Sequence, residues 1–198
     1  MPELFGRLFT DPDFAYDAIR RRLRLTASLG TEDRRVLEQI IFPDLLADPA
    51  IGAALFVGCD WYTKQYERLF SPKVDYWTID PDPARRKFGA KQHVIAPLEE
   101  VERHFPTARF DLIICNGVYG WGLDGRAASE SAFAQCHACL RTGGLFMLGW
   151  DDLPARTPVP LEELASLRLF APSRFPALDS WRYLTDTPYR HTYAFYRK

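Results

Sequence analysis

The sequence predicts an α/β fold: a doubly wound, mostly parallel sheet of seven strands with an antiparallel last strand and an N-terminal helical cap. Three observations support this prediction. From about residue 50 onward, short and continuously apolar runs alternate with helix-like segments. The last part of the chain carries two strand-like runs joined by a short turn, and the first part is helical in pattern. Strand–helix alternation of this kind gives a parallel sheet with right-handed crossovers.

The expected parallel strands are apolar or β-branched throughout, as in strands that are covered on both faces. They span residues 53–57, 74–79, 92–95, 110–115 and 145–150. The segments between them are long enough for short crossover helices, at 62–70, 82–87, 98–104 and 127–140. We expect the last helix to close at Gly143-Gly144, because glycine adopts the left-handed conformation that ends a helix. This arrangement is Rossmann-like.

The two ends of the chain depart from this repeat. Runs 181–185 and 189–196 are joined by a turn containing Pro188, which predicts a hairpin and an antiparallel last strand. Near the start, an apolar stripe at helical spacing predicts a helix. The stripe consists of Tyr16, Ile19, Leu23 and Ala27. We therefore divide the chain into a helical cap, residues 1–50, and a sheet domain, residues 51–198.

A basic patch lies on the first predicted helix. It consists of the arginines at positions 20, 21, 22 and 24. Short basic runs occur often by chance, so a solvated face is the favoured interpretation. A contact to a phosphate-bearing substrate is the alternative.

Composition excludes several classes of function. The 198 residues contain 25 Lys+Arg and 26 Asp+Glu, a formal net charge of −1, so duplex nucleic acid is not an expected partner. No apolar run approaches the ~20 residues of a membrane span, and the N-terminus lacks the pattern of a signal peptide. We therefore expect a cytoplasmic protein with no membrane partner. A homodimer is left open.

Four cysteines are too few for a disulfide framework. Cys136 and Cys139 flank His137, but no second pair completes a zinc site. Since they also fall within a predicted helix, we expect them to pack in the core, and we expect no metal.

Two residues at the ends of the expected strands indicate a nucleoside site, because ligands of open α/β sheets bind outside the carboxyl ends of the strands. Gly58 follows the first strand and permits close approach of a ligand to the backbone. Asp80 follows the second strand, 22 residues later, near the spacing of an acid that accepts both ribose hydroxyls. An ordinary Asp-Pro turn is the alternative. The glycine-rich loop that cradles a pyrophosphate is missing, so a nucleoside without a diphosphate fits better than NAD or FAD.

With these features the sequence resembles the class I S-adenosylmethionine-dependent methyltransferases over roughly residues 50–198. The resemblance rests on four segments: Leu55-Phe56-Val57-Gly58-Cys59-Asp60, Tyr76-Trp77-Thr78-Ile79-Asp80, Phe110-Asp111-Leu112-Ile113-Ile114-Cys115-Asn116-Gly117 and Leu140-Arg141-Thr142-Gly143-Gly144-Leu145. It implies that residues 51–198 bind S-adenosylmethionine and release S-adenosylhomocysteine. Two departures stand out. The first loop has a single glycine, and Ala96 stands where the family often has an acid for the adenine amino group.

The resemblance also implies which residues contact the cofactor. Gly58 would lie under the methionine moiety, Asp80 would hold the ribose, and the segment after the third strand would border the adenine. The implied cofactor-binding residues are Gly58, Cys59, Asp60, Asp80, Pro81, Ala96, Leu98, Asn116 and Gly117.

Aromatic residues make up 14% of the chain, and several follow the predicted strands. Aromatic faces attract a desolvated sulfonium through cation–π interaction, although core packing is the usual role of an aromatic residue. Tyr119 and Trp121 lie in a glycine-flanked loop, which favours a ligand lid or pocket wall. The predicted substrate-binding residues are Trp61, Tyr62, Tyr119, Trp121 and Trp150.

A hydroxyl acceptor benefits from a general base within reach of its proton, whereas an amine can do without one. The candidate catalytic residues are Asp124, Asp151 and His191. Each has a structural alternative: an Asp-Gly turn for Asp124, a surface turn for Asp151 and a hydrogen-bonded sheet histidine for His191.

The sequence thus predicts a methyltransferase with a small-molecule acceptor, with a hydroxyl of a sugar or secondary metabolite favoured over a nitrogen. Two alternatives stay open. The single-glycine loop and Ala96 fit a catalytically weak, methyltransferase-like binding or scaffold subunit. A nicotinamide-dependent oxidoreductase is the third interpretation, and the missing pyrophosphate loop argues against it.

Overall fold

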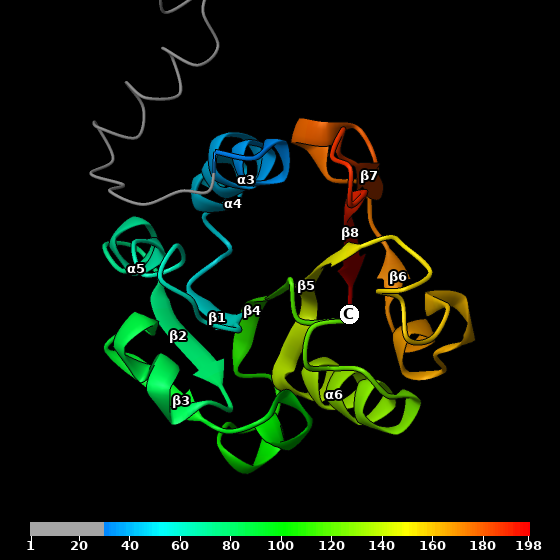
Figure 1. The fold of residues 1–198 in the computed structure, drawn as a ribbon. Coiled ribbons are helices and arrows are strands. Elements are labelled where there is room, and N and C mark those ends of the chain that lie inside the picture. The colour runs from blue at the N-terminus through cyan, green and yellow to red at the C-terminus, as the bar shows by residue number, and fades with distance from the viewer. Residues whose placement is uncertain (1–29) are drawn as a thin grey trace, which may run out of the picture.

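A computed structural model describes residues 30–198 of the chain (Figure 1). The predicted apolar stripe of residues 16–27 and the arginines at 20–24 lie outside the described residues. The described part opens with a helical stretch made of α3 (Glu32–Val36), η1 (Leu37–Ile41) and α4 (Phe42–Ala47). The division into a cap, 1–50, and a sheet domain, 51–198, stays a prediction.

A single sheet of eight strands follows, in the spatial order β3-β2-β1-β4-β5-β8-β6, with β7 also paired to β8. The strands are β1 (Ala53–Val57), β2 (Asp75–Asp80), β3 (Gln92–Ile95), β4 (Phe110–Asn116), β5 (Leu140–Asp151), β6 (Ala171–Pro172), β7 (Arg182–Leu184) and β8 (His191–Arg197). Strands β1 to β5 pair in parallel, and β8 runs antiparallel to β5. The mostly parallel, Rossmann-like sheet with an antiparallel last strand is confirmed.

The sheet has one strand more than the seven predicted. Strand β6 has only two residues, Ala171–Pro172, and pairs with the end of β8. Two residues carry no readable period, so the sequence pattern could not reveal this strand.

The end of α6 (Arg126–Cys139), the longest helix among residues 30–198, also differs from the prediction. The helix stops at Cys139, and Leu140 is already extended and begins β5. Gly143 does have a positive φ of 77°, but it lies within β5, where the register with β4 shifts. The glycine therefore shapes an irregularity of the strand rather than the end of the helix.

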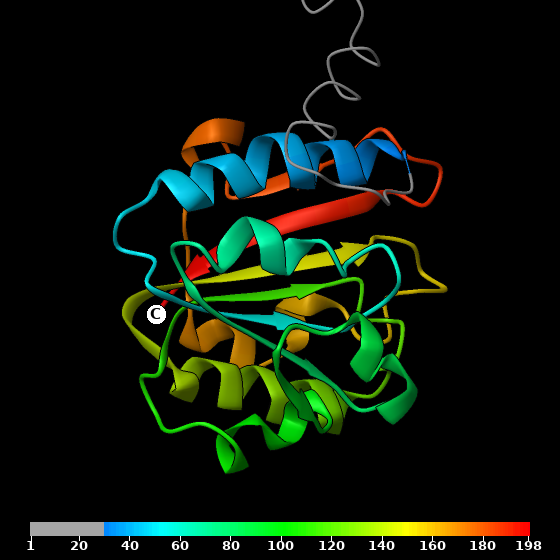
Figure 2. The same cartoon turned by 90° about the vertical axis from the view of Figure 1, so that its left-hand side faces the viewer.

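Helices cover both faces of the sheet (Figure 2). The stretch α3–η1–α4 and α5 (Tyr66–Phe70) lie on one face, and α6 with η3 (Leu98–Arg103) lies on the other. Further short segments are η2 (Pro83–Phe88), η4 (Leu161–Glu163), η5 (Ser166–Leu169) and η6 (Pro176–Leu178). Along β1, Leu55 belongs to the core beside α6, whereas Phe56 belongs to the core beside α4. Two covered faces explain why the strands are continuously apolar.

None of the helices between residues 30 and 198 combines the length and the apolar character that crossing a bilayer requires.

Asp111 ties the start of β1 to β4. Its Oδ2 accepts hydrogen bonds from the backbone N–H groups of Gly52 and Ala53, both at 2.8 Å, and Arg141 forms an ion pair with its other oxygen. We expect Asp111→Ala to lower the free energy of unfolding by about 2 kcal/mol, because two backbone donors lose their partner. Urea unfolding measures the loss, with the exposed Asp186→Ala as control. Equal stabilities of the Asp111 variant and the parent would contradict this role.

All four cysteines are buried free thiols. Burial raises the pKa of Cys59 to about 12, and the charge of Asp80 adds to the shift; burial also raises the pKa of Cys115 to about 12 and of Cys139 to about 11. Only the thiolate reacts, so at pH 8 a thiol with a pKa of 12 is reactive in about one molecule in 10⁴.

We therefore expect a colorimetric disulfide reagent to titrate almost no thiol in the folded protein at pH 8 and all four after unfolding. The rate of reaction should rise with pH up to pH 10, since every increase in pH enlarges the thiolate fraction. A thiol that reacts completely within minutes at pH 8 without unfolding would disprove this.

Candidate active site

A cavity of about 350 Å³ opens at the carboxyl ends of β1, β2 and β4. At this point the strand order reverses, because β2 and β3 lie on one side of β1 while β4 lies on the other. Doubly wound sheets bind their ligands at such a position. All nine residues predicted to bind the cofactor line the cavity, and so do Tyr62 and Trp121.

Gly58 opens the cavity on the side of β1. Its φ is 81°, and its backbone N–H donates to the carbonyl of Ile79 at 2.9 Å. A Cβ at this position would lie 2.8 Å from Cγ2 of Val118. Both the backbone conformation and the packing therefore require glycine, and the bare backbone faces the cavity.

Asp80 is the buried carboxylate of the site, with 5% of its surface exposed. Its Oδ2 accepts from the backbone N–H of Cys59 at 2.7 Å, and its Oδ1 accepts from that of Asp82 at 2.9 Å. Each carboxylate oxygen can accept a second hydrogen bond. The carboxyl group is thus held in place with capacity left for two hydroxyl groups.

Arg85 joins the loops that follow β1 and β2. Its Nη1 donates to the carbonyl of Cys59 at 2.7 Å and to Oδ2 of Asp60 at 2.9 Å. The side chain is 44% exposed, so this ion pair lies at the rim of the cavity. It holds the loop of Gly58 against the η2 segment.

Arg34 of α3 lines the cavity and is only 6% exposed. Its Cζ lies 4.5 Å from the centre of the Tyr62 ring, and its Nη1 donates to the hydroxyl of Tyr66 at 3.3 Å. Its Nε lies 3.6 Å from a carboxylate oxygen of Asp33 and has no hydrogen-bond partner within residues 30–198. A buried guanidinium with free hydrogen-bonding capacity can bind an anionic group.

Neither Arg34 nor Arg85 was predicted from the sequence. A signal for Arg34 exists, since it precedes the buried residues Leu37 and Ile41 by three and seven positions. It therefore lies on the apolar stripe of its own helix, where an unneeded charge is costly. Arg85 belongs to an ordinary basic run, and no local signal separates it from its neighbours.

Asn116, at the end of β4, contacts His191, which in turn contacts Asp151. His191 Nε2 lies 3.0 Å from Asn116 Oδ1, and His191 Nδ1 lies 2.7 Å from Asp151 Oδ1. Trp121 Nε1 donates to the other oxygen of Asp151 at 3.0 Å. Only Asn116 and Trp121 of these four line the cavity. The candidate bases Asp151 and His191 therefore do not reach the cavity directly.

Two of the aromatic residues predicted to bind substrate lie in the core and not on the cavity wall. Tyr119 and Trp150 are 0% and 1% exposed. The ring of Tyr119 packs 5.9 Å from that of Phe133, and its hydroxyl hydrogen-bonds the backbone of Val159. Trp150 extends the apolar face of β5 that includes Phe146. An aromatic residue that follows a strand can still pack in the core against segments that are distant along the chain. A local sequence pattern does not reveal such packing.

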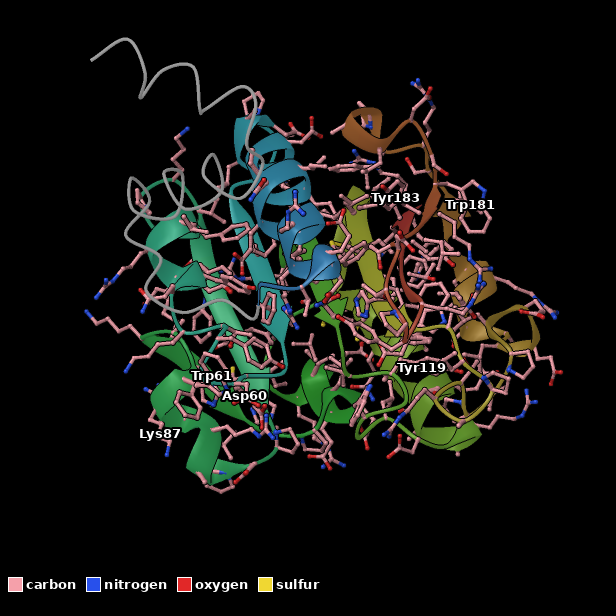
Figure 3. The ribbon with its side chains drawn as sticks, turned by 45° about the horizontal axis from the view of Figure 1, so that its top comes forward. Asp60, Trp61, Lys87, Tyr119, Trp181 and Tyr183 are labelled. Carbon is pink, nitrogen blue, oxygen red and sulfur yellow. The ribbon has the colours of Figure 1, made fainter. Side chains whose placement is uncertain are left out.

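Trp61 and Asp124 lie outside the cavity. Trp61 is about half exposed and packs edge-on against Tyr62, with ring centres 5.5 Å apart. In Figure 3 the labelled Trp61 and Tyr119 lie far apart. Asp124 is exposed, and its side chain accepts a hydrogen bond from the backbone N–H of Gly122 at 3.3 Å. This contact fits the structural alternative for Asp124, a residue of a turn.

The described residues contain no group of three or more side chains that could hold a metal ion. Cys136 and Cys139 pack in the core, and His137 lies edge-on to the ring of Phe170 at 5.0 Å.

Solved methyltransferases share this architecture. The N-methyltransferase NodS from Bradyrhizobium japonicum WM9 aligns with a TM-score of 0.65 and 17% identity over 87% of this chain and 99% of its own. A TehB-like SAM-dependent methyltransferase from Corynebacterium glutamicum ATCC 13032 Kitasato aligns with a TM-score of 0.61 and 17% identity over 95% of this chain and 100% of its own.

The 1,6-didemethyltoxoflavin-N1-methyltransferase of Burkholderia thailandensis, with 1,6-didemethyltoxoflavin and S-adenosylhomocysteine bound, gives a TM-score of 0.51 and 15% identity over 87% of this chain and 92% of its own. No protein-family model matches the sequence, and no curated protein is significantly similar to it. The order of the strands, the antiparallel β8 and these alignments agree: the chain has the fold of the class I S-adenosylmethionine-dependent methyltransferases.

Proposed function

We propose that the protein transfers a methyl group from S-adenosylmethionine to a small-molecule acceptor. The observation that carries this proposal is Asp80, a buried carboxylate fixed at the strand-order reversal with capacity for two further hydrogen bonds. The ribose of a nucleoside offers two hydroxyls at this spacing. The shared fold supports the proposal, since NodS has also been solved in complex with S-adenosylhomocysteine.

The cavity offers a partner for each part of the methyl donor. Asp80 would accept hydrogen bonds from the ribose. Ala96 and Leu98 would border the adenine with apolar surface, since both are lining residues. The bare backbone at Gly58 would lie along the methionine chain, because no Cβ fits there. Arg34 would bind the methionine carboxylate, the one anionic group of that ligand.

When bound, S-adenosylmethionine supplies an activated methyl group on a cationic sulfur. The task of the chain is to hold the acceptor in line with that methyl group and to exclude water. None of the three candidate bases lines the cavity. We therefore propose that the chain acts by positioning the acceptor within this cavity.

The reacting atom of the acceptor stays a prediction. The sequence favours an oxygen of a sugar or secondary metabolite. NodS and the toxoflavin enzyme are N-methyltransferases, so a nitrogen acceptor is the second candidate.

Calorimetry with S-adenosylmethionine and S-adenosylhomocysteine tests the proposal. We expect dissociation constants below about 100 μM for both, and an absence of binding at about 1 mM would contradict the function. An acceptor screen that follows production of S-adenosylhomocysteine then separates the enzyme from the binding-subunit alternative.

A further inference from the structure

A second cavity adjoins the first at Trp121. It opens between the loop that follows β4 and the loop that follows β5, and Trp121 and Gly122 line both cavities. The indole of Trp121 is held in place, because its Nε1 donates to Asp151 at 3.0 Å, although 53% of the residue is exposed. A molecule that enters the first cavity beside Trp121 can therefore extend into the second.

Arg156 stacks on Trp121 and lines the second cavity but not the first. Its guanidinium carbon, Cζ, lies 3.6 Å from the centre of the Trp121 ring. The backbone of Arg156 is also fixed, because its N–H donates to the carbonyl of Leu153 at 2.8 Å and a Cβ at Gly120 would overlap its carbonyl oxygen. Stacking uses the face of a guanidinium and leaves the N–H groups at its edge free to donate.

The guanidinium of Arg156 has no polar partner in the described part of the chain. Among residues 30–198, every arginine guanidinium except those of Arg68 and Arg156 donates a hydrogen bond or forms an ion pair. Arg68 is exposed on α5 and lines neither cavity. Arg156 thus offers a cavity a set of ordered N–H donors that the described residues do not use.

Two carboxylates lie near Arg156, and neither forms an ion pair with it. Asp124 lines the same cavity, and its Oδ1 accepts from a backbone N–H of its own loop at 3.3 Å. Asp151 is hydrogen-bonded at both oxygens, to His191 and to Trp121. Since both carboxylates bind other groups, the guanidinium is available to an anion that does not belong to the chain.

We propose that the second cavity binds the methyl acceptor by an anionic group, a carboxylate or a phosphate, which Arg156 holds beside Trp121. A planar guanidinium donates two parallel hydrogen bonds to either group. The acceptor reaches past Trp121 into the first cavity with the atom that receives the methyl group. This inference rests on the proposed function and narrows its substrate class to anionic small molecules. Arg156 is a specificity-determining residue, because it binds a part of the acceptor that does not react.

Binding of three probes to the protein saturated with S-adenosylhomocysteine tests the proposal. Benzoate, phenyl phosphate and benzamide share a ring and differ in charge, and the bound nucleoside keeps them away from Arg34. We expect saturation-transfer NMR to show that at least one anion binds about tenfold more tightly than benzamide. The tighter anion distinguishes a carboxylate from a phosphate acceptor. Equal binding of all three probes, or no binding of either anion at about 10 mM, overturns the proposal.

Three variants assign the preference to Arg156. Arg156→Gln should bind all three probes equally, with unchanged affinity for S-adenosylhomocysteine. Arg68→Gln is the matched control, because it removes an exposed, unpaired arginine that lines neither cavity, and it should keep the preference. Asp124→Asn should tighten anion binding, since it removes a like charge from the same cavity. Anion binding that is unchanged in Arg156→Gln overturns the role of Arg156.

Steady-state kinetics with an anionic acceptor provide a second measurement. Arg156→Gln should raise KM at least about tenfold and change kcat less than about threefold, because the contact is equally strong in the bound acceptor and in the transition state. A neutral acceptor that the parent and Arg156→Gln convert equally well would overturn the substrate class.

Calorimetry with S-adenosylhomocysteine on the parent protein separates this inference from the proposed function. Failure to bind contradicts the methyl-transfer function. The probes are then measured on Arg34→Met, which removes the other arginine with free hydrogen-bonding capacity that lines the first cavity. A preference for an anion that is lost on adding Arg156→Gln supports the anion site by itself, and its absence overturns that site.

Discussion

Asp80→Ala is expected to weaken binding of S-adenosylhomocysteine about a hundredfold. A charge-assisted hydrogen bond contributes about 1.5–3 kcal/mol, and the ribose would lose two of them. Each factor of ten corresponds to about 1.4 kcal/mol, so a hundredfold loss is close to the lower limit of what two such bonds contribute. Calorimetry measures the change, and a dissociation constant equal to that of the parent would place the nucleoside elsewhere.

Asp80 also anchors the backbone of Cys59 and Asp82, so the folding of this variant must be followed. Asp80→Asn is the matched control, because its single carbonyl oxygen replaces one of the two acceptors. We expect its affinity to lie between those of the parent and the alanine variant. Binding of a 2′,3′-dideoxy analogue should differ little among the three proteins, since it lacks both hydroxyls.

Arg34→Met is expected to weaken binding of S-adenosylhomocysteine at least thirtyfold. The methionine side chain preserves much of the apolar contact with Tyr62 but removes the buried charge that would face the ligand carboxylate. An ion pair that is shielded from water contributes several times more than a surface pair. Calorimetry again gives the dissociation constant.

Two comparisons make this second result specific. Decarboxylated S-adenosylmethionine lacks the anionic group, so parent and Arg34→Met should bind it within about threefold of each other. Arg35→Met is the control variant, because Arg35 is its neighbour and pairs with Glu32 at 3.2 Å near the surface. If Arg34→Met weakens both ligands equally, Arg34 supports the helix rather than the carboxylate.

The fold was largely predictable because its information is local. Continuously apolar runs identified β1 to β5, and both faces of β1 are indeed buried. The position of Gly58 and Asp80 at strand ends was predictable for the same reason, since the carboxyl ends of neighbouring parallel strands meet at one edge of the sheet.

The sequence did not predict the contacts between segments that are distant along the chain. Tyr119 lies among glycines, but Val159, forty residues later, holds its hydroxyl in the core. His191 and Asp151 are also forty residues apart, and only the pairing of β5 with β8 brings them together behind Asn116. The periodicity of apolar residues and the spacing of motifs describe one helix or strand at a time. Neither of these two contacts could therefore be predicted from them.

Within the described part of the chain, the edges of the sheet are short, and this has a consequence for assembly. One edge is β3, with four residues, and the other is divided between β6 and β7, with two and three residues. Within β6, Pro172 has no N–H to offer an incoming strand. Short, interrupted edges of this kind give another chain little backbone to pair with and so oppose aggregation by strand addition. Any stable association of this sheet with a second copy is therefore expected through its helical faces or loops, leaving the strand ends around the cavity accessible to ligands.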